Sequence, residues 1–314
     1  MKLSVITPSF NQGEFIDRTI QSVLSQTLEH PEDSLEYFVC DGGSQDQTLD
    51  ILANYHDRFD CFRYCSEPDR GQAHGVNKGI ENTDGEIIGW LNSDDCYYPH
   101  AFQTVLSYFR ANPDILVIYG QANHVDENDR FLEAYPVEPW NYQRLLQTCF
   151  ICQPAVFFRR SVVQRFGGLN EAFEYAMDYE FWLRCGKAID FVYVPQVLAT
   201  SRLYGTTKTL SNRPAVFYES GQAVKLHWGS IPDRWVLGHA FVVASDQVAG
   251  KKSMGSTQYD RIFFKAFLSA SLKNFKAWGQ IPTPWGVGKL LYWFIRCYFQ
   301  IHPKSQSHSQ SPIK

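Results

Sequence analysis

Two adjacent carboxylates follow an apolar run in the segment IIGWLNSDDCYYP, residues 87–99. The apolar part is typical of a buried β-strand, whereas Asp94 and Asp95 are charged at neutral pH. Asn, Ser and Asp are common in turns and at helix starts, so a plain turn is one interpretation. A binding site is the other interpretation, since carboxylates are ligands that Mg²⁺ and Mn²⁺ prefer.

Similar polar clusters follow other apolar runs of the chain. The strand-like runs are LSVIT (3–7), LEYFVC (35–40), CFRYC (61–65), EIIGWL (86–91) and ILVIYG (115–120). Segments with helical spacing of apolar residues lie between them, as in EFIDRTIQSVLSQ. This alternation predicts an α/β fold with a mostly parallel central sheet flanked by helices.

The polar clusters occupy the loops that leave the carboxyl ends of the predicted strands. They are TPSFNQG, DGGSQD, SEPDRGQ and NSDD, in chain order. Ligands bind at that edge of a parallel sheet, so the four loops predict a single site. The first loop has no GxGxxG and the chain has no GxxxxGK[ST], which counts against an NAD-type oxidoreductase and a P-loop enzyme. Because the loops are acidic, a bound diphosphate would require a divalent cation between them, Mn²⁺ or Mg²⁺.

The motifs, in this order, resemble those of inverting family 2 glycosyltransferases, which have the GT-A (Rossmann-like) fold. The resemblance covers about residues 3–210 and rests on VITPSFNQGEFIDRTIQSVLSQT, CDGGSQDQT, EPDRGQAHGVNKGI, LNSDD, QPAVFFRR, FGGLNE and MDYEFWLR. It implies a hexosyltransferase that uses a nucleoside-diphosphate sugar, with a UDP-sugar favoured. The implied acceptor is a glycan or a lipid-linked molecule, in polysaccharide or cell-surface glycan biosynthesis.

The resemblance also implies roles for individual residues. The metal ligands would be Asp94 and Asp95, and the donor would be bound by Thr7, Pro8, Ser9, Phe10, Asp41, Asp69, Arg70, Asn77, Lys78, Asn92, Ser93 and Asp94. Asp41 has an alternative role in an Asx-turn before two glycines, and Lys78 in a solvated helix face. Asn92 departs from the family, which often has Asp there.

The acceptor hydroxyl must lose a proton during transfer, and a carboxylate is the usual general base. Asp178 in YAMDYEFWLRCG matches the catalytic base of the family, with Glu180 as the second candidate. An N-cap of the following helix is the alternative for Asp178, and Arg184 is expected to anchor that helix. Tyr204 stands where the family often has a His, and Tyr204 or Lys208 could reach the diphosphate.

The C-terminal part is basic and aromatic. Residues 251–314 contain ten Lys or Arg and one acidic residue, a formal charge of +9, so residues 1–250 carry −13. YDRIFFKAFLSASLKNFKAWG and WGVGKLLYWFIRCYF are amphipathic, and they either bind an anionic membrane surface or pack on the catalytic domain. We predict a catalytic domain at 1–215, a helical extension at 216–302 and a disordered tail at 303–314.

Eight cysteines are scattered, mostly within apolar runs, and the chain begins with a β-like run in place of a secretory signal. We therefore expect a cytoplasmic protein, in part peripheral at the inner membrane surface, with no nucleic-acid partner. Two rival classes stay open at this stage: a non-catalytic module that binds nucleotide sugars or glycans, and a nucleotidyltransferase.

Overall fold

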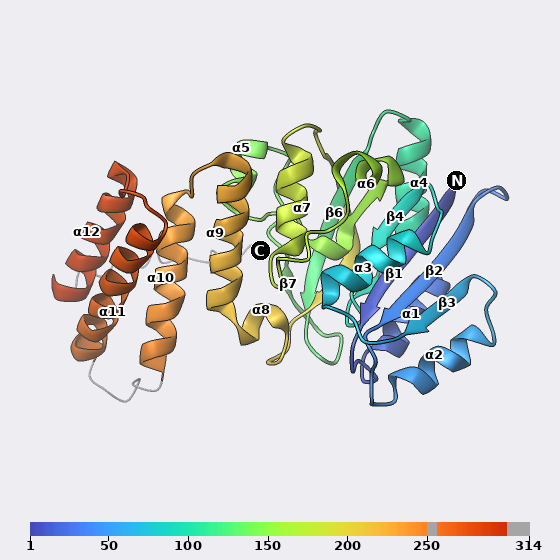
Figure 1. Cartoon of the computed structure of the whole chain (residues 1–314), viewed down its shortest axis with the longest axis horizontal. Helices are drawn as coiled ribbons and strands as arrows, with labels where there is room; N and C mark the ends of the chain where they lie inside the picture. Colours follow the sequence, from blue (N-terminus) through green and yellow to red (C-terminus); the bar gives the residue numbers. More distant parts are fainter. Residues whose placement is uncertain (250–255, 300–314) are drawn as a thin grey trace, which may run out of the picture. The chain divides into compact units, whose positions relative to one another are not determined.

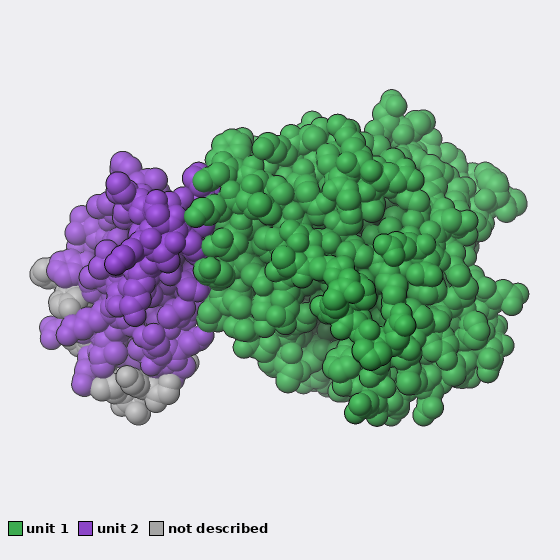
Figure 2. Space-filling model, viewed as in Figure 1, with its two compact units in different colours: residues 1–229 green, residues 230–314 purple. Residues whose placement is uncertain are grey.

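The structure is a computed structural model that describes residues 1–249 and 256–299. The chain divides into two compact units, Met1–Gly229 and Ser230–Lys314 (Figure 2). The division falls after helix α9 (Arg213–Trp228), whereas the sequence suggested a boundary at 215/216. Helix α9 belongs to the first unit because it packs against α7 (Met177–Gly186). The predicted tail at 303–314 lies outside the described residues.

The first unit is built on one sheet, with nine strands among the described residues (Figure 1). The strand order is β3-β2-β1-β4-β8-β6-β9-β5, and β7 pairs with β6 at the side. The strands are β1 Lys2–Ser9, β2 Ser34–Asp41, β3 Phe62–Ser66, β4 Ile87–Trp90, β5 Cys96–Tyr97, β6 Val117–Val125, β7 Phe131–Ala134, β8 Val156–Arg159 and β9 Val192–Arg202.

The other helices of this unit connect those strands. They are α1 Ile16–Leu24, α2 Thr48–His56, α3 Gln72–Glu81, α4 Ala101–Ala111, α5 Tyr142–Leu145, the 3₁₀ helix η1 Gln153–Ala155, α6 Arg160–Phe166 and α8 Lys208–Ser211. The strand and helix alternation predicted for the N-terminal half is confirmed.

The sheet is parallel from β3 to β4 and mixed beyond that point. Strand β8 runs antiparallel to both of its neighbours, β4 and β6, while β6 and β9 are parallel. The local pattern of apolar runs carries no information on this direction, which depends on pairings between distant segments. The α/β architecture is as predicted, with a larger antiparallel share than the sequence suggested.

Successive side chains of β1 point to opposite faces of the sheet, and each face is covered by a helix. Leu3 and Val5 belong to the buried cluster that also contains Ile16 of α1. Ile6 points to the opposite face, where a Cβ on Gly79 of α3 would lie 2.3 Å from its side chain. Glycine therefore lets α3 approach the sheet closely.

The carboxyl ends of the first strands meet at one edge of the sheet. Ser9 pairs with Asp41, Asp41 pairs with Ser66, and Ile6 pairs with Trp90 in register. The loops after β1, β2, β3 and β4 therefore emerge together, as predicted from the sequence.

The second unit contains α10 Asp233–Val248, α11 Ser256–Ala277 and α12 Pro284–Phe299. The apolar side of α11 is used inside this unit, since Phe263 and Phe267 are buried and contact the ring of Trp293. Among the described residues, no helix has the length and apolar character needed to cross a membrane.

Candidate active site

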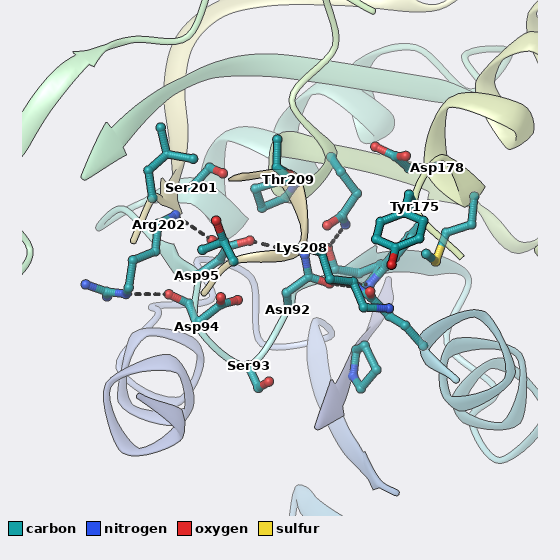
Figure 3. Close-up of a pocket in the computed structure, with 18 of the residues that line it drawn as sticks. Asn92, Ser93, Asp94, Asp95, Tyr175, Asp178, Ser201, Arg202, Lys208 and Thr209 are labelled. Carbon is teal, nitrogen blue, oxygen red and sulfur yellow. Dashed lines mark hydrogen bonds between the residues drawn. The ribbon is translucent and has the colours of Figure 1, made fainter. Parts of the chain in front are cut away.

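A cavity of about 600 Å³ opens at the carboxyl edge of the sheet. It is lined by the loops after β1, β3 and β4, by the start of α7 and by the segment that follows β9 (Figure 3). The predicted site residues that line it are Pro8, Ser9, Phe10, Asp69, Asn92, Ser93, Asp94, Asp95 and Asp178. Residues more than 80 positions apart in the chain thus share one cavity.

The two neighbouring carboxylates have different surroundings. Asp95 is buried, and its oxygens accept hydrogen bonds from the backbone N–H of Arg202 at 2.8 Å and from Nδ2 of Asn92 at 3.3 Å. Asp94 accepts one from the hydroxyl of Tyr204 at 3.1 Å. Burial raises the pKa of both carboxyls, and the charge of Asp94 raises the pKa of Asp95 further.

Arg202 fixes the turn that carries this pair. Its guanidinium donates to the carbonyl oxygens of Asp94 and Asp126, each at 2.7 Å, and forms an ion pair with Asp129. The guanidinium also lies 5.1 Å from the ring centre of Phe15. Sequence reasoning missed Arg202, although the arginine beside Tyr204 in SRLYG was a signal.

Asn92 has a specific place in the same turn. Its Oδ1 accepts hydrogen bonds from Nε2 of Gln72 at 2.7 Å and from Nε1 of Trp90 at 3.0 Å, while its Nδ2 donates to Asp95. An aspartate could accept the first two bonds but could not donate the third. Asn at position 92, where the family often has Asp, therefore avoids a third carboxylate beside those of Asp94 and Asp95.

The acidic pair fits a cation that is shared with a substrate. In the described part of the chain, no group of three or more His, Cys, Asp or Glu side chains could hold a metal ion by itself. Mg²⁺ is often held by one or two carboxylates together with water and substrate phosphate oxygens. Two adjacent carboxyls with raised pKa values suit that arrangement, because a cation would offset their mutual repulsion.

Asp178 lies in the first turn of α7 and faces the cavity (Figure 3). The N-cap of this helix is Ala176, so the structure does not support the N-cap interpretation of Asp178. Burial raises the pKa of the Asp178 carboxyl to about 6. A carboxylate that titrates near neutral pH at a cavity wall is suited to accept a proton.

Glu180 is not among the described residues that line the cavity, and its carboxylate makes contacts inside the fold. Its buried carboxylate accepts hydrogen bonds from Arg184 at 3.0 Å and from Nε2 of His227 at 2.8 Å. Burial opposes ionisation, but the bonds from His227 and Arg184 together lower the pKa of Glu180. Arg184 also donates to the carbonyl oxygen of Gly168 at 2.8 Å, so it anchors α7 as expected.

Several residues that were predicted to bind the sugar donor make hydrogen bonds within the chain in this structure. Asp41 is buried and accepts hydrogen bonds from the backbone N–H groups of Gly43 and Ser44 at 3.0 and 2.9 Å. This is the Asx-turn geometry that the sequence allowed as an alternative. The hydroxyl of Thr7 is 3.1 Å from that of Tyr37. Donor contacts by Thr7 and Asp41 stay predictions.

The residues of the third loop and α3 also have partners in the chain. Asn77 brackets Leu169, donating to its carbonyl oxygen at 2.9 Å and accepting from its N–H at 2.7 Å. Lys78 pairs with Glu67 at 2.8 Å. Arg70 pairs with Glu171 at 2.8 Å. None of these three side chains, two cations and one amide, is among the described residues that line the cavity. Their donor roles stay predictions as well.

Known proteins of the same architecture define the fold class. Staphylococcus aureus TarS 1–349, solved in complex with UDP-GlcNAc, matches with a TM-score of 0.61 at 16% identity, covering 90% of this chain and 93% of that one. The mannosyltransferase PcManGT from Pyrobaculum calidifontis, solved with GDP-Man and Mn²⁺, matches with a TM-score of 0.59 at 16% identity, covering 96% and 88%. The first unit therefore has the GT-A fold.

Sequence comparison gives the family. The Glycosyl transferase family 2 model matches residues 4–167, and the chain belongs to this family. It is 26% identical over 208 residues to a chondroitin synthase of Escherichia coli, covering 66% of this chain but 30% of that protein. An uncharacterized glycosyltransferase of Rickettsia prowazekii (strain Madrid E) is 28% identical over 230 residues, covering 67% of each.

Proposed function

We propose that the protein transfers a sugar, with inversion, from a nucleoside-diphosphate sugar to a hydroxyl of a glycan or lipid-linked acceptor. The observation that carries the proposal is the shared cavity: Asp94 and Asp95 line it on the donor side and Asp178 on the other wall. A UDP-sugar is the favoured donor, and polysaccharide or cell-surface glycan synthesis is the proposed setting. Similarity to TarS and PcManGT supports the nucleotide-sugar class but not a particular sugar.

The proposed reaction is one in-line displacement. Asp178 accepts the proton of the acceptor hydroxyl, whose oxygen forms a bond to the anomeric carbon of the donor. The bond from that carbon to the diphosphate oxygen breaks on the opposite face, and the nucleoside diphosphate leaves. A bound Mn²⁺ or Mg²⁺ would supply charge stabilisation to the leaving diphosphate. Asp94, with Asp95 behind it, would hold the ion.

A screen of nucleotide sugars tests the proposal. The intact protein is mixed with UDP-, GDP-, CDP- and dTDP-sugars, each with Mn²⁺, Mg²⁺ or EDTA, and the melting temperature is recorded. A ligand that binds only the folded state raises apparent stability, so at least one UDP-sugar with Mn²⁺ is expected to raise Tm. No shift with any donor would overturn the proposal. A shift without release of nucleoside diphosphate, even with added acceptors, would favour the non-catalytic binding module.

A membrane surface is proposed as a further partner, with a cytoplasmic location. The outward residues of α12 include Trp285, Val287, Leu291 and Tyr292, exposed by 45–55%. Lys289 lies 5.6 Å from the ring centre of Trp285, which places a cation beside the apolar side chains. Helices of this composition bind anionic bilayer interfaces.

A further inference from the structure

The cavity wall beside Asp178 contains an aromatic residue, Tyr175, that is not among the residues proposed to bind the donor. Tyr175 lies three positions before Asp178, just ahead of α7, and both residues line the cavity. Figure 3 shows them on the same side of the cavity, with Lys208 nearby. Tyr175 is half-buried, so part of it remains accessible.

The backbone of Tyr175 is held by a carboxylate from a distant helix. Glu219 of α9 accepts hydrogen bonds from the backbone N–H groups of Glu174, Tyr175 and Ala176 at 3.1, 2.6 and 3.0 Å. Displacing this segment would leave a half-buried carboxylate without its three donors, which is costly. The position of Tyr175 relative to α7 is therefore fixed by α9.

The phenol of Tyr175 is held as well. Nδ2 of Asn212, at the N-terminus of α9, donates to the Tyr175 hydroxyl at 3.1 Å. Nζ of Lys208 donates to the carbonyl oxygen of Glu174 at 3.4 Å. Among the side chains described, those of residues 1–249 and 258–295, no aromatic ring stacks on Tyr175. The Tyr175 ring is thus held at its backbone and at its hydroxyl but has no stacked aromatic neighbour, so it can pack against a ring of a ligand.

The chemistry of this wall favours a neutral sugar. One face of a pyranose ring presents C–H groups, which pack on the electron-rich face of an aromatic ring, while its hydroxyls point outward. Met177 and Ile151 also line the cavity and add apolar surface. A phosphate group would meet the carboxylates of Asp178 and Glu174 here, and the ammonium group of Lys208 is engaged with the carbonyl oxygen of Glu174.

We propose that Tyr175 is the platform that binds the sugar ring of the acceptor, and that Glu219 is the residue that positions this platform. The acceptor is then a glycan with a pyranose at the reacting end, in preference to a bare lipid phosphate. The inference rests on the proposed function, since Asp178 would deprotonate a hydroxyl of the sugar bound on Tyr175.

Direct binding separates this inference from turnover. Methyl and p-nitrophenyl hexosides serve as probes in saturation-transfer NMR with the intact protein. The wild type and Tyr175→Phe are expected to bind at least one hexoside, and Tyr175→Ala is expected to weaken that binding about tenfold. Equal binding by Tyr175→Ala, or no binding of any hexoside by the wild type, would overturn the inference whether or not a donor binds. A wild type that binds hexosides but no nucleotide sugar would contradict the proposed function alone.

Kinetics test the positioning role. With a donor identified by the nucleotide-sugar screen, Tyr175→Ala and Glu219→Gln are expected to raise the acceptor KM about tenfold, whereas the donor Kd stays unchanged. Because Glu219 acts through Tyr175, the double variant should be little worse than Tyr175→Ala. Glu81→Gln, at the exposed end of α3, is the control for loss of a carboxylate. The proposal would be contradicted if the effects of the two substitutions on the acceptor KM added up, or if donor affinity fell in parallel. Efficient transfer to polyprenyl phosphate that Tyr175→Ala leaves unchanged would contradict it as well.

Discussion

At the residue scale, the site depends on carboxyl groups placed in unlike surroundings. The Asp178 carboxyl stands alone at the start of α7, and burial raises its pKa to about 6. Asp94 and Asp95 are adjacent, so the charge of Asp94 raises the pKa of Asp95. Arg202 donates its backbone N–H to the Asp95 carboxylate and its guanidinium to the carbonyl oxygen of Asp94. One carboxyl is thus suited to exchange a proton, and two to share a cation.

Replacing Asp178 by Asn should remove the base while keeping the shape of the side chain. We expect kcat to fall by about 10²–10⁴, with donor Kd unchanged. In the wild type, kcat/KM should rise with pH through about 6 and then level off, because the base must be ionised. Steady-state rates from pH 5 to 8.5 and calorimetry with the donor check both points. Glu133→Asn, on the exposed strand β7, is the control. Retained turnover in Asp178→Asn would exclude the base assignment.

The same substitution should increase stability at neutral pH. The folded-state pKa of Asp178 lies above the ordinary value of 3.8, so the folded state binds this proton more tightly than the unfolded state. The contribution of Asp178 to wild-type stability therefore falls as pH rises from about 4 through about 6, whereas Asn does not titrate. Asp178→Asn should be more stable at pH 8, by up to about 3 kcal/mol, and the difference should vanish near pH 4. Denaturant unfolding at both pH values measures this, and a constant difference would contradict it.

Asn92→Asp should make the protein more dependent on metal. The variant loses the hydrogen bond to Asp95 and adds a third negative charge beside the pair. We expect a lower Tm in EDTA and a larger rise in Tm with Mn²⁺ and UDP than in the wild type, because a cation gains a ligand. Asn112→Asp, at the end of α4, is the matched control. An equal Mn²⁺ response in Asn92→Asp and wild type would show that position 92 does not act on the metal.

At the element scale, the helices that follow the matched family region differ in where their side chains are engaged. Helix α9 carries Glu219 and His227, which contact the loop before α7 and Glu180 inside it. Helix α11 buries its phenylalanines within the second unit. Helix α12 differs, because several of its large apolar side chains are exposed.

Helix α12 should therefore govern membrane binding. In flotation assays with the intact protein, vesicles rich in phosphatidylglycerol should recruit the wild type, and pure phosphatidylcholine vesicles should recruit it less. A Trp285→Ala, Leu291→Ala double variant should reduce recruitment several-fold through loss of buried apolar area. Phe131→Ala with Leu132→Ala is the matched control, since both residues are exposed apolar side chains of β7. If the α12 variant floats as well as the control, the membrane proposal is wrong.

At the whole-molecule scale, charge divides unevenly between the two parts of the chain. The acidic part, residues 1–250, contains the cavity, and the basic part contains α11 and α12. The first unit has its own sheet and core, so it has the means to fold by itself.

A chain ending at Gly229 tests this division. We expect it to keep the donor-induced rise in Tm, since every residue that lines the cavity belongs to residues 8–210. It should lose binding to anionic vesicles, because it lacks α12. Thermal shift and flotation, run beside the full chain, measure the two properties. Loss of both properties in a folded truncated chain would show that the units act as one.

The sequence by itself determined the strands and helices of the N-terminal half and the meeting of their loops, and it singled out Asp94, Asp95 and Asp178, which all line the cavity. These features depend on local physics: the alternation of apolar runs, the turn residues after each run, and motifs contained within a few residues. Tertiary structure alone decided the direction of β8, the place of Arg202 under the Asp pair, and the hold of Glu219 on Tyr175. Each of these joins side chains or strands more than 40 positions apart, and the local spacing of apolar residues in a sequence carries no information on such pairs. Asp41, which the resemblance assigned to the donor, accepts the hydrogen bonds of a local turn from residues two and three positions ahead, the alternative that its own turn residues allowed.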